Sequence, residues 1–322
     1  MFSRLSRALL VSVALLLPAA VLAQKYPTKP IRLIIPFAPG GTNDVLGRMT
    51  AQHLTEALGE TVIPDNRTGF QGIIGTNLAA KADPDGYTLV VISAGYTMNP
   101  ATFKLPYDTL TALEVVARIG ESFLIVTVGP KLPEVRSVKD LLATAQRRPG
   151  EIVFTTSGGF MNFATHLFQS VTKQKYNIVV YKGGYPAMID VLGGQGDAHL
   201  AVSLPALPFL RSGQLKGLAV ALQQRSELMP DVPTLVEAGI EGYEAANWYA
   251  IAAPARTPRA IVMKLHNEIA RFFKSPEMLK KMTAMGAVVD IKTPDEMRKI
   301  IPAEVAKWAK VASDAGMPRG DP

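Results

Sequence analysis

Short runs of apolar, often β-branched residues recur along this chain, and amphipathic segments lie between them. Continuously apolar runs are typical of strands covered on both faces, and their alternation with helices favours an α/β fold with parallel sheets. With 322 residues, the chain is long enough for two domains. The predicted strands include IRLIIPFA, TVIPDN, TLVVISA, FLIVTVGP, EIVFTTS, NIVVYKG, AHLAVSL and LKGLAVAL.

Hydroxyl residues at several points predict where helices begin. Ser137, followed three residues later by Asp140, resembles a capping box. The last third of the chain is predicted to be mostly helical, and Pro302 should kink or restart its final helix. Three pairs place a hydroxyl cap before a proline at the first helical position, namely Thr257-Pro258, Ser275-Pro276 and Thr293-Pro294.

The first residues, MFSRLSRALLVSVALLLPAAVLAQ, have the three parts of a secretory signal peptide. Arg4 and Arg7 precede an apolar stretch, which ends at a small-residue cleavage site near Ala23. We therefore expect residues 1–23 to be removed and the protein to be exported to the periplasm. An uncleaved membrane anchor is the alternative, but the apolar run is short and contains Pro18.

No low-complexity linker separates the predicted domains. The chain is expected to cross between them in strands or short loops near residues 121–129 and 248–254. This predicts a discontinuous first domain, 24–124 and 249–322, with a second domain, 125–248, inserted into it. Such a layout forms a hinged cleft, and ligands of open α/β sheets bind beyond the carboxyl ends of the strands.

Five strand ends carry glycine or small polar residues that suit an anion. Glycine lets backbone N–H groups approach a ligand, and the start of a following helix adds the positive end of its dipole. Each such loop alone is more often a simple turn, but two such turns facing across a cleft would hold a carboxylate. The loops are PFAPGGTND (36–44), DNRTGFQGIIG (65–75), SAGYTMNP (93–100), TSGGFMNFATH (156–166) and YKGGYPAM (181–188).

Small polar side chains in two of these loops are candidate helix caps. Thr42, Asn43 or Asp44 would cap the first helix, and Ser157 or Asn162 would cap its counterpart in the inserted domain. Asp44 would also repel an anionic ligand, so its carboxylate is interpreted as a brace for nearby amides.

The sequence lacks the motifs that cofactor, nucleic-acid or metal binding would require. The chain has no cysteine and no GxGxxG, GxxxxGK[ST] or GxSxG pattern, so no cofactor is expected. Lys and Arg are scattered despite a net charge of +7, which argues against nucleic acid as a partner and suits attraction of small anions. No metal site is expected because the four histidines are far apart, at His53, His166, His199 and His266.

Several motifs, quoted in chain order, resemble one known family. They are PFAPGGTNDVLGR, DNRTGFQGIIGTN, PDGYTLVV, YKGGYPAMIDVLGGQGD, LRSGQLKGLAV, PDVPTLVEAG and NWYAIAAPARTP. Nearly all of the chain after residue 23 is similar to the Bug family (TctC-type) of periplasmic solute-binding proteins, the receptors of tripartite tricarboxylate transporters. The resemblance implies an α/β, two-domain type II periplasmic-binding-protein fold with a ligand cleft between the domains. It also implies a small carboxylate ligand and membrane transporter subunits as partners, and we expect a monomer.

The resemblance carries the family's ligand positions onto the first turn, the next strand-end loop and two turns of the inserted domain. An aromatic at the return crossing, Trp248, would either wall the cleft or pack the hinge. The complete predicted ligand-binding set is Phe37, Pro39, Gly40, Gly41, Thr42, Asn43, Asp44, Ser93, Ala94, Tyr96, Ser157, Gly158, Phe160, Asn162, Phe163, Gly183, Gly184, Pro186, Ala187 and Trp248.

One stretch departs from the family pattern. Where the family usually reads glycine-any-glycine-Ser/Thr shortly before a His-Leu pair, this chain has FMNF, residues 160–163. We hypothesise that Phe160 or Phe163 forms an apolar wall that favours an aromatic or longer-chain carboxylate. Alternatively, Phe163 faces the core of the inserted domain, as apolar residues usually do.

The leading interpretation is a binding protein without catalytic residues that closes on its ligand and delivers it to a membrane transporter. One alternative is an exported α/β enzyme acting on a carboxylate, for which His166 or Asp197 would be the candidate base. A second alternative is a sensing module that presents its ligand-bound form to a signalling partner.

Overall fold

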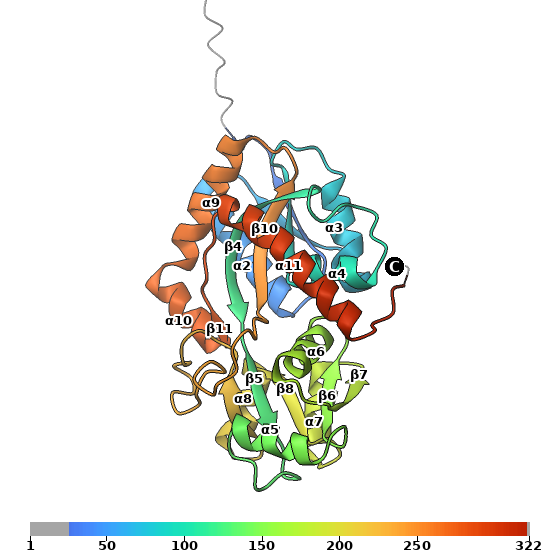
Figure 1. Cartoon of the computed structure of the whole chain (residues 1–322). Coiled ribbons are helices and arrows are strands. Elements are labelled where there is room, and N and C mark those ends of the chain that lie inside the picture. Colours follow the sequence, from blue (N-terminus) through green and yellow to red (C-terminus); the bar gives the residue numbers. More distant parts are fainter. Residues whose placement is uncertain (1–25, 321–322) are drawn as a thin grey trace, which may run out of the picture.

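The computed structural model describes residues 26–320, and the predicted signal peptide with its cleavage point near Ala23 lies outside them. The chain folds into two lobes, each built on one sheet (Figure 1). The fold is the expected two-domain α/β arrangement. Among the described residues, no helix combines the length and apolar content needed to cross a bilayer.

The first lobe is built on a mixed sheet with the strand order β11-β4-β10-β3-β1-β2. β1 pairs in parallel with β2 and β3, whereas β10 runs antiparallel to β3 and β4, and β11 runs antiparallel to β4. Its strands are β1 (Ile31–Ile35), β2 (Val62–Asn66), β3 (Thr88–Ser93), β4 (Leu113–Ser122), β10 (Asn247–Pro254) and β11 (Ala287–Val288).

The second lobe is built on a sheet with the order β7-β6-β8-β5-β9. β6 pairs in parallel with β7 and β8, while β5 is antiparallel to β8 and β9. Its strands are β5 (Leu124–Val128), β6 (Val153–Ser157), β7 (Asn177–Tyr181), β8 (Ala198–Val202) and β9 (Lys216–Val220).

The expectation of parallel sheets is wrong at the strands that link the lobes. β4 ends at Ser122 and β5 begins at Leu124, so the chain passes directly from one sheet into the other. It returns through β10, which must run in the opposite direction and therefore pairs antiparallel with β4. The predicted domain limits at residues 124 and 248 stay a prediction, although these strands mark where the sheets meet.

Helices cover both sheets. In the first lobe they are α2 (Thr42–Leu58), the 3₁₀ turn η1 (Phe70–Gly72), α3 (Ile73–Ala80), α4 (Gly95–Thr102), α9 (Arg259–Phe273), α10 (Pro276–Ala284) and α11 (Pro294–Asp314). In the second lobe they are α5 (Val138–Arg147), α6 (Phe160–Thr172), α7 (Gly184–Leu192) and α8 (Ser203–Arg211). α11 runs across the first lobe and reaches α6, so it contacts both lobes (Figure 1).

Three of the predicted helix starts are confirmed. The side chains of Ser137, Ser275 and Thr293 accept hydrogen bonds from backbone N–H groups three residues later, and Thr293 forms a full capping box with Glu296. The prediction for Thr257 is wrong, because its hydroxyl donates to the Pro254 carbonyl and α9 begins only at Arg259.

The predicted restart at Pro302 is also wrong, while the alternative of a kink there stays a prediction. Pro302 lies inside α11, which runs without interruption from Pro294 to Asp314. Proline removes one N–H from a helix, and a well-packed helix can absorb that loss. Here the apolar face on both sides of Pro302 is held in the core by Ile301 and Trp308, which are both buried.

Two large apolar clusters fill the interior. One lies between the first sheet and helices α2 and α9. The other includes buried residues of both lobes, among them Phe163, Trp248 and Trp308. The lobes therefore share part of their core.

Candidate functional site

The first predicted turn connects β1 to α2. Gly40 has φ of 85°, a left-handed conformation that favours glycine, and residues 38–41 are exposed. The N-cap of α2 is Gly41, and no side chain caps it. The prediction that Thr42, Asn43 or Asp44 would cap this helix is therefore wrong. Because no side chain occupies the helix start, its backbone N–H groups can receive an external acceptor.

Asp44 braces this turn, as its position in the sequence indicated. Its carboxylate accepts hydrogen bonds from the Gly40 N–H at 2.9 Å, from Asn66 Nδ2 at 2.8 Å and from Arg48 Nε at 3.0 Å. Asn66 Nδ2 also donates to the Phe37 carbonyl at 3.0 Å. Burial raises the pKa of Asp44, but these hydrogen bonds outweigh it and lower the pKa to about 2. The carboxylate therefore holds the turn in shape.

The second predicted turn connects β6 to α6. The N-cap of α6 is Gly159, with φ of 66° and ψ of −137°, and no side chain caps the helix. The predicted caps Ser157 and Asn162 are therefore wrong for the same reason as in the first turn, since glycine occupies the position. Gly158 is exposed, Ser157 is buried, and Phe160 is half-buried.

A third turn, residues 181–184, leads from β7 into α7 beside the second turn. Gly183 has φ of 144°, and Ser157 Oγ lies 3.9 Å from the position of a Cβ placed on Gly184. Pro186 is exposed and Ala187 is fully buried. The small residues of the two turns in the second lobe therefore lie close together.

The loop at residues 69–72 brings the lobes together at these turns. The side-chain oxygen of Gln71 lies 3.1 Å from the position that a Cβ on Gly159 would occupy. Asn99 Nδ2 donates to the Gln71 carbonyl at 3.4 Å, and the Phe37 ring lies 3.1 Å from the Cβ position of Gly72. The predicted ligand set omits Gln71, although it lies in one of the five candidate loops.

Two predicted side chains carry buried polar atoms that lack partners. Within residues 26–320, Asn43 Oδ1 in the first turn and Asn162 Oδ1 in the second form no hydrogen bond. His166, one helical turn after Asn162, has an unpartnered Nδ1 as well. Burial lowers the pKa of His166, which favours its neutral form. Buried polar atoms are usually hydrogen-bonded, so these unpartnered atoms are consistent with a site that binds a polar ligand.

Four other predicted ligand residues are buried, and their side chains are engaged within the protein. Phe163 packs edge to face on Trp308 with ring centroids 5.8 Å apart, so it faces the shared core. Trp248 Nε1 donates to Glu304 at 3.4 Å, and the Tyr96 hydroxyl donates to the Thr109 carbonyl at 2.7 Å. Ala94 is fully buried. The backbone of Ala94 is engaged as well, since its N–H donates to the Trp248 carbonyl at 3.0 Å.

Asp197, the candidate base of the enzyme alternative, is engaged structurally. It is 1% exposed, accepts a hydrogen bond from the Val153 N–H at 2.7 Å and pairs with Lys131 at 3.4 Å. Among the described residues, no group of three or more His, Asp or Glu side chains is arranged to hold a metal ion.

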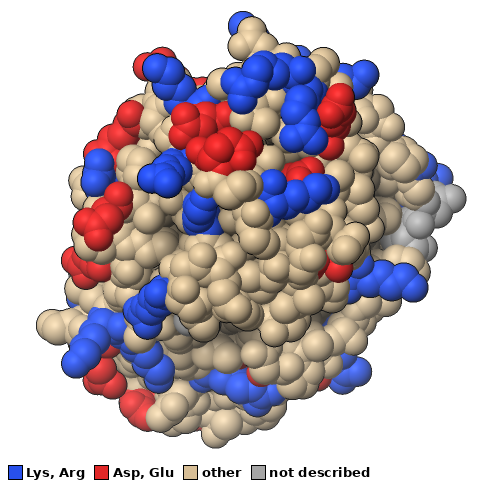
Figure 2. Space-filling view, turned by 90° about the horizontal axis from the view of Figure 1, so that it is seen from below, with Lys and Arg blue, Asp and Glu red and all other residues tan. Residues whose placement is uncertain are grey.

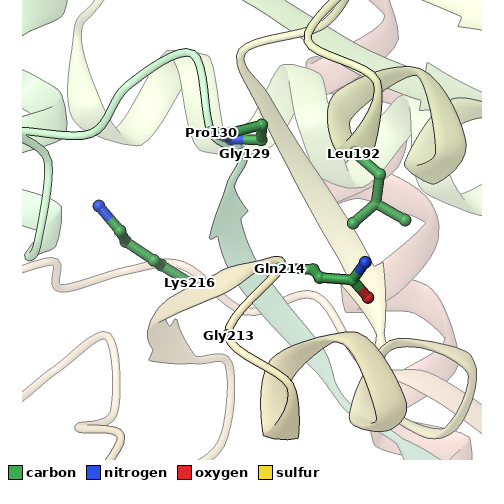
Figure 3. A pocket seen from close by; sticks show the side chains of 6 residues that line it. All are labelled: Gly129, Pro130, Leu192, Gly213, Gln214 and Lys216. Carbon is green, nitrogen blue, oxygen red and sulfur yellow. The ribbon is translucent and has the colours of Figure 1, made fainter.

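Two cavities lie away from the predicted turns. A cavity of about 190 Å³ is lined by residues of the second lobe, including Leu192, Gln214 and Lys216 (Figure 3). A larger one of about 1130 Å³ is lined by residues of both lobes, including Arg118, Glu121 and Trp248. Trp248 is the one predicted ligand residue that lines either cavity. Seen from below, Lys and Arg side chains lie mostly around an uncharged centre, with Asp and Glu among them (Figure 2).

Comparison with known proteins places these features in a family. A family model described as the tripartite tricarboxylate transporter family receptor, TctC, matches residues 46–317. Protein BugT of Bordetella pertussis is 37% identical over 306 residues, covering 92% of this chain and 93% of BugT.

Solved structures agree with this match. An R. palustris protein solved with adipate is 33% identical, with a TM-score of 0.76 over 92% of this chain and 100% of that one. MatC from Rhodopseudomonas palustris, with bound malate, is 26% identical, with a TM-score of 0.71 over 89% of this chain and 99% of that one. This chain belongs to the TctC family, the receptors of tripartite tricarboxylate transporters.

Proposed function

We propose that this protein is a periplasmic receptor that holds a small carboxylate between its lobes and delivers it to a membrane transporter. The observation that carries the proposal is the approach of the first-lobe loop at Gln71 to the second-lobe turn at Gly159. The same loop packs against Phe37, at the start of the first turn, through Gly72. Both turns lead into helices that no side chain caps.

The chemistry of the two turns suits a carboxylate. Backbone N–H groups at a helix start are donors without a charge of their own, and the helix dipole favours a negative group there. The helix α2 has 17 residues and α6 has 13, so both dipoles are developed. We propose that residues 41–43 hold one carboxylate and residues 157–160, with Gly183 and Gly184, hold the other end of the solute.

The proposed ligand is a dicarboxylate or a longer carboxylate with an apolar middle. Two relatives, one solved with adipate and one with malate, support an acid of this class. Because Phe163 is part of the core, the proposed apolar wall is provided by Phe160, which is half-buried beside the second turn. Phe160 would favour the longer, less polar acid.

Closure is proposed to occur about the strands that link the lobes. The residues at these links are 122–124 and 247, so the two proposed domains are 24–124 with 249–322, and 125–248. A ligand that touches both lobes only in the closed state stabilises that state by the difference in its affinities. The closed form would then be recognised by the transporter subunits. We propose no catalysis, since Asp197 is engaged and family members are receptors.

A thermal-shift screen of the purified protein tests the proposal. A ligand that binds only the folded state raises the melting temperature, by an amount that grows with its concentration. The screen would compare adipate, malate, succinate and benzoate with adipamide, the neutral diamide of adipate. We expect a shift for at least one acid and none for the diamide. No shift for any acid, or an equal shift for adipamide, would contradict a carboxylate site.

A further inference from the structure

The turn at residues 69–72 has a backbone conformation that its sequence does not favour. Four consecutive residues have positive φ, namely Gly69 at 137°, Phe70 at 41°, Gln71 at 53° and Gly72 at 89°. Glycine adopts such angles freely, but Phe and Gln rarely do. Non-glycine residues in this conformation persist only where the surrounding structure holds them, and they concentrate at functional sites.

Groups of the first lobe hold this conformation in place. The Gly72 N–H donates to the Gly69 carbonyl at 3.0 Å, and Asn99 Nδ2 donates to the Gln71 carbonyl at 3.4 Å. The Phe37 ring fills the space beside Gly72, where a Cβ would lie 3.1 Å from it. The turn is therefore fixed against both the first turn and helix α4.

This conformation directs the Gln71 side chain toward the second lobe. Its Oε1 and Cδ lie 3.1 and 3.6 Å from the position of a Cβ placed on Gly159. Gly159 has no Cβ, and its positive φ disfavours any other residue. Gln71 as a whole remains exposed.

We propose that Gln71 is a specificity-determining residue that contacts the solute across the cleft. Its carboxamide carries donors without a charge, and Nε2 would donate to the solute's carboxylate at the end held by the second turn. Gln71 is fixed in the first lobe and reaches the second. It would therefore favour closure only around a solute that is long enough to contact its carboxamide. This inference rests on the proposed carboxylate-receptor function.

Two substitutions at Gln71 separate the role of the carboxamide from that of the backbone. Gln71→Ala removes the carboxamide but keeps a side chain at positive φ, whereas Gln71→Gly removes the carboxamide and relieves the strain. Lys173→Gly is the matched control, because Lys173 is exposed, has φ of 54° and ends α6 away from the turn. Each variant would be titrated calorimetrically with adipate, malate and succinate.

We expect both Gln71 variants to bind the acid preferred by wild type at least tenfold more weakly. Gln71→Gly should at the same time melt at a higher temperature than Gln71→Ala. Weaker binding in a variant that is more stable cannot be explained by loss of the folded structure. Lys173→Gly should bind as wild type does. Wild-type affinity in Gln71→Ala would overturn the inference while leaving the proposed function intact.

A measurement without solute reports separately on the contact between the lobes. In both Gln71 variants we expect faster amide hydrogen exchange at residues 158–162 than in wild type, and unchanged exchange there would overturn the cross-lobe contact. If wild type binds none of the three acids while exchange responds as expected, the solute contact is overturned. The proposed function then fails for these acids, and the contact between the lobes stands.

Discussion

Phe163 of α6 and Trp308 of α11 meet edge to face, with ring centroids 5.8 Å apart, and join a helix of the second lobe to the C-terminal helix of the first. Phe163 is 4% exposed, and Trp308 is fully buried. The pair therefore stabilises the shared core. Phe160, three residues earlier on the same helix, is half-buried beside the second turn and provides a natural contrast.

Alanine at these two positions should separate stability from ligand preference. Phe163→Ala should lower the free energy of unfolding by about 3 kcal/mol, because a large core side chain leaves a cavity. Phe160→Ala should cost about 1 kcal/mol and reduce the preference for adipate over malate. Urea unfolding and calorimetric titration measure the two effects. If Phe163→Ala changes the ligand preference and Phe160→Ala does not, Phe160 does not form the apolar wall.

Asp44→Asn should loosen the first turn in a manner that depends on pH. The folded-state pKa of Asp44 is lowered from 3.8 to about 2, so its contribution is present above pH 4 and is lost as pH falls through 2. We expect the variant to be about 1–2 kcal/mol less stable at pH 7, allowing for screening of the half-exposed Arg48 partner. Urea unfolding of both proteins between pH 7 and pH 2 should show that the difference between their free energies of unfolding becomes smaller as the pH falls. A constant difference would contradict the role of the carboxylate.

His199 should make stability fall in mild acid. Burial lowers its pKa from 6.5 to about 4, although Nδ1 is in hydrogen-bond contact with the Thr155 carbonyl at 2.8 Å. The unfolded chain then binds a proton that the folded chain does not, so stability is lost as pH falls from 6.5 to about 4. The loss should approach about 3 kcal/mol.

The variant His199→Asn provides the comparison for this pH dependence. Asparagine keeps a donor near Nδ1 but does not titrate in this range. We expect a flatter profile of unfolding free energy against pH in the variant, even if it is less stable throughout. An unchanged slope between pH 6.5 and pH 4 would assign the acid sensitivity to other groups.

Glu304 should contribute more to the free energy of unfolding than a solvent-exposed carboxylate does, since its side chain is only 16% exposed. Its Oε2 accepts hydrogen bonds from Trp308 Nε1 at 2.9 Å and from Trp248 Nε1 at 3.4 Å, and its Oε1 pairs with Lys307 at 2.5 Å. Glu304→Gln replaces one acceptor oxygen by a donor, so we expect a loss of about 1–2 kcal/mol.

The exposed pair of Lys310 and Asp314 provides the control for Glu304. These groups are 76% and 47% exposed and lie 2.7 Å apart on the same helix. Asp314→Asn should change the unfolding free energy by less than about 0.5 kcal/mol. Equal effects of the two substitutions in urea unfolding would contradict the importance of the two indole contacts.

The elements that sequence predicted best are those whose cause is local. Continuously apolar runs predicted β1, β2 and β3 of the first sheet and the strands of the second, but not β10 or β11. Hydroxyl caps at Ser137, Ser275 and Thr293 placed helix starts. β4 was not predicted, because charged residues such as Arg118 and Glu121 interrupt its apolar run. Its antiparallel pairing with β10 depends on how the chain passes between the lobes, which no local pattern encodes.

The candidate site shows the same division. Glycine turns after strands marked the two helix starts, but a glycine N-cap carries no side-chain signal, so the predicted caps were wrong. From the sequence, either Phe160 or Phe163 could have formed the apolar wall. The packing of Phe163 on Trp308 distinguishes the two residues. The approach of Gln71 to Gly159 joins residues 88 positions apart in different lobes, and sequence alone does not reveal it.

Calorimetric titration of the purified protein with adipate and with adipamide, followed by small-angle scattering of the same samples, tests the central claim most directly. The two compounds share a chain length and differ in the charge that the helix starts would hold. We predict one-to-one binding of adipate, no measurable binding of adipamide, and a smaller radius of gyration only with adipate. Equal binding of the two compounds, or adipate binding without compaction, would contradict a carboxylate held between closing lobes.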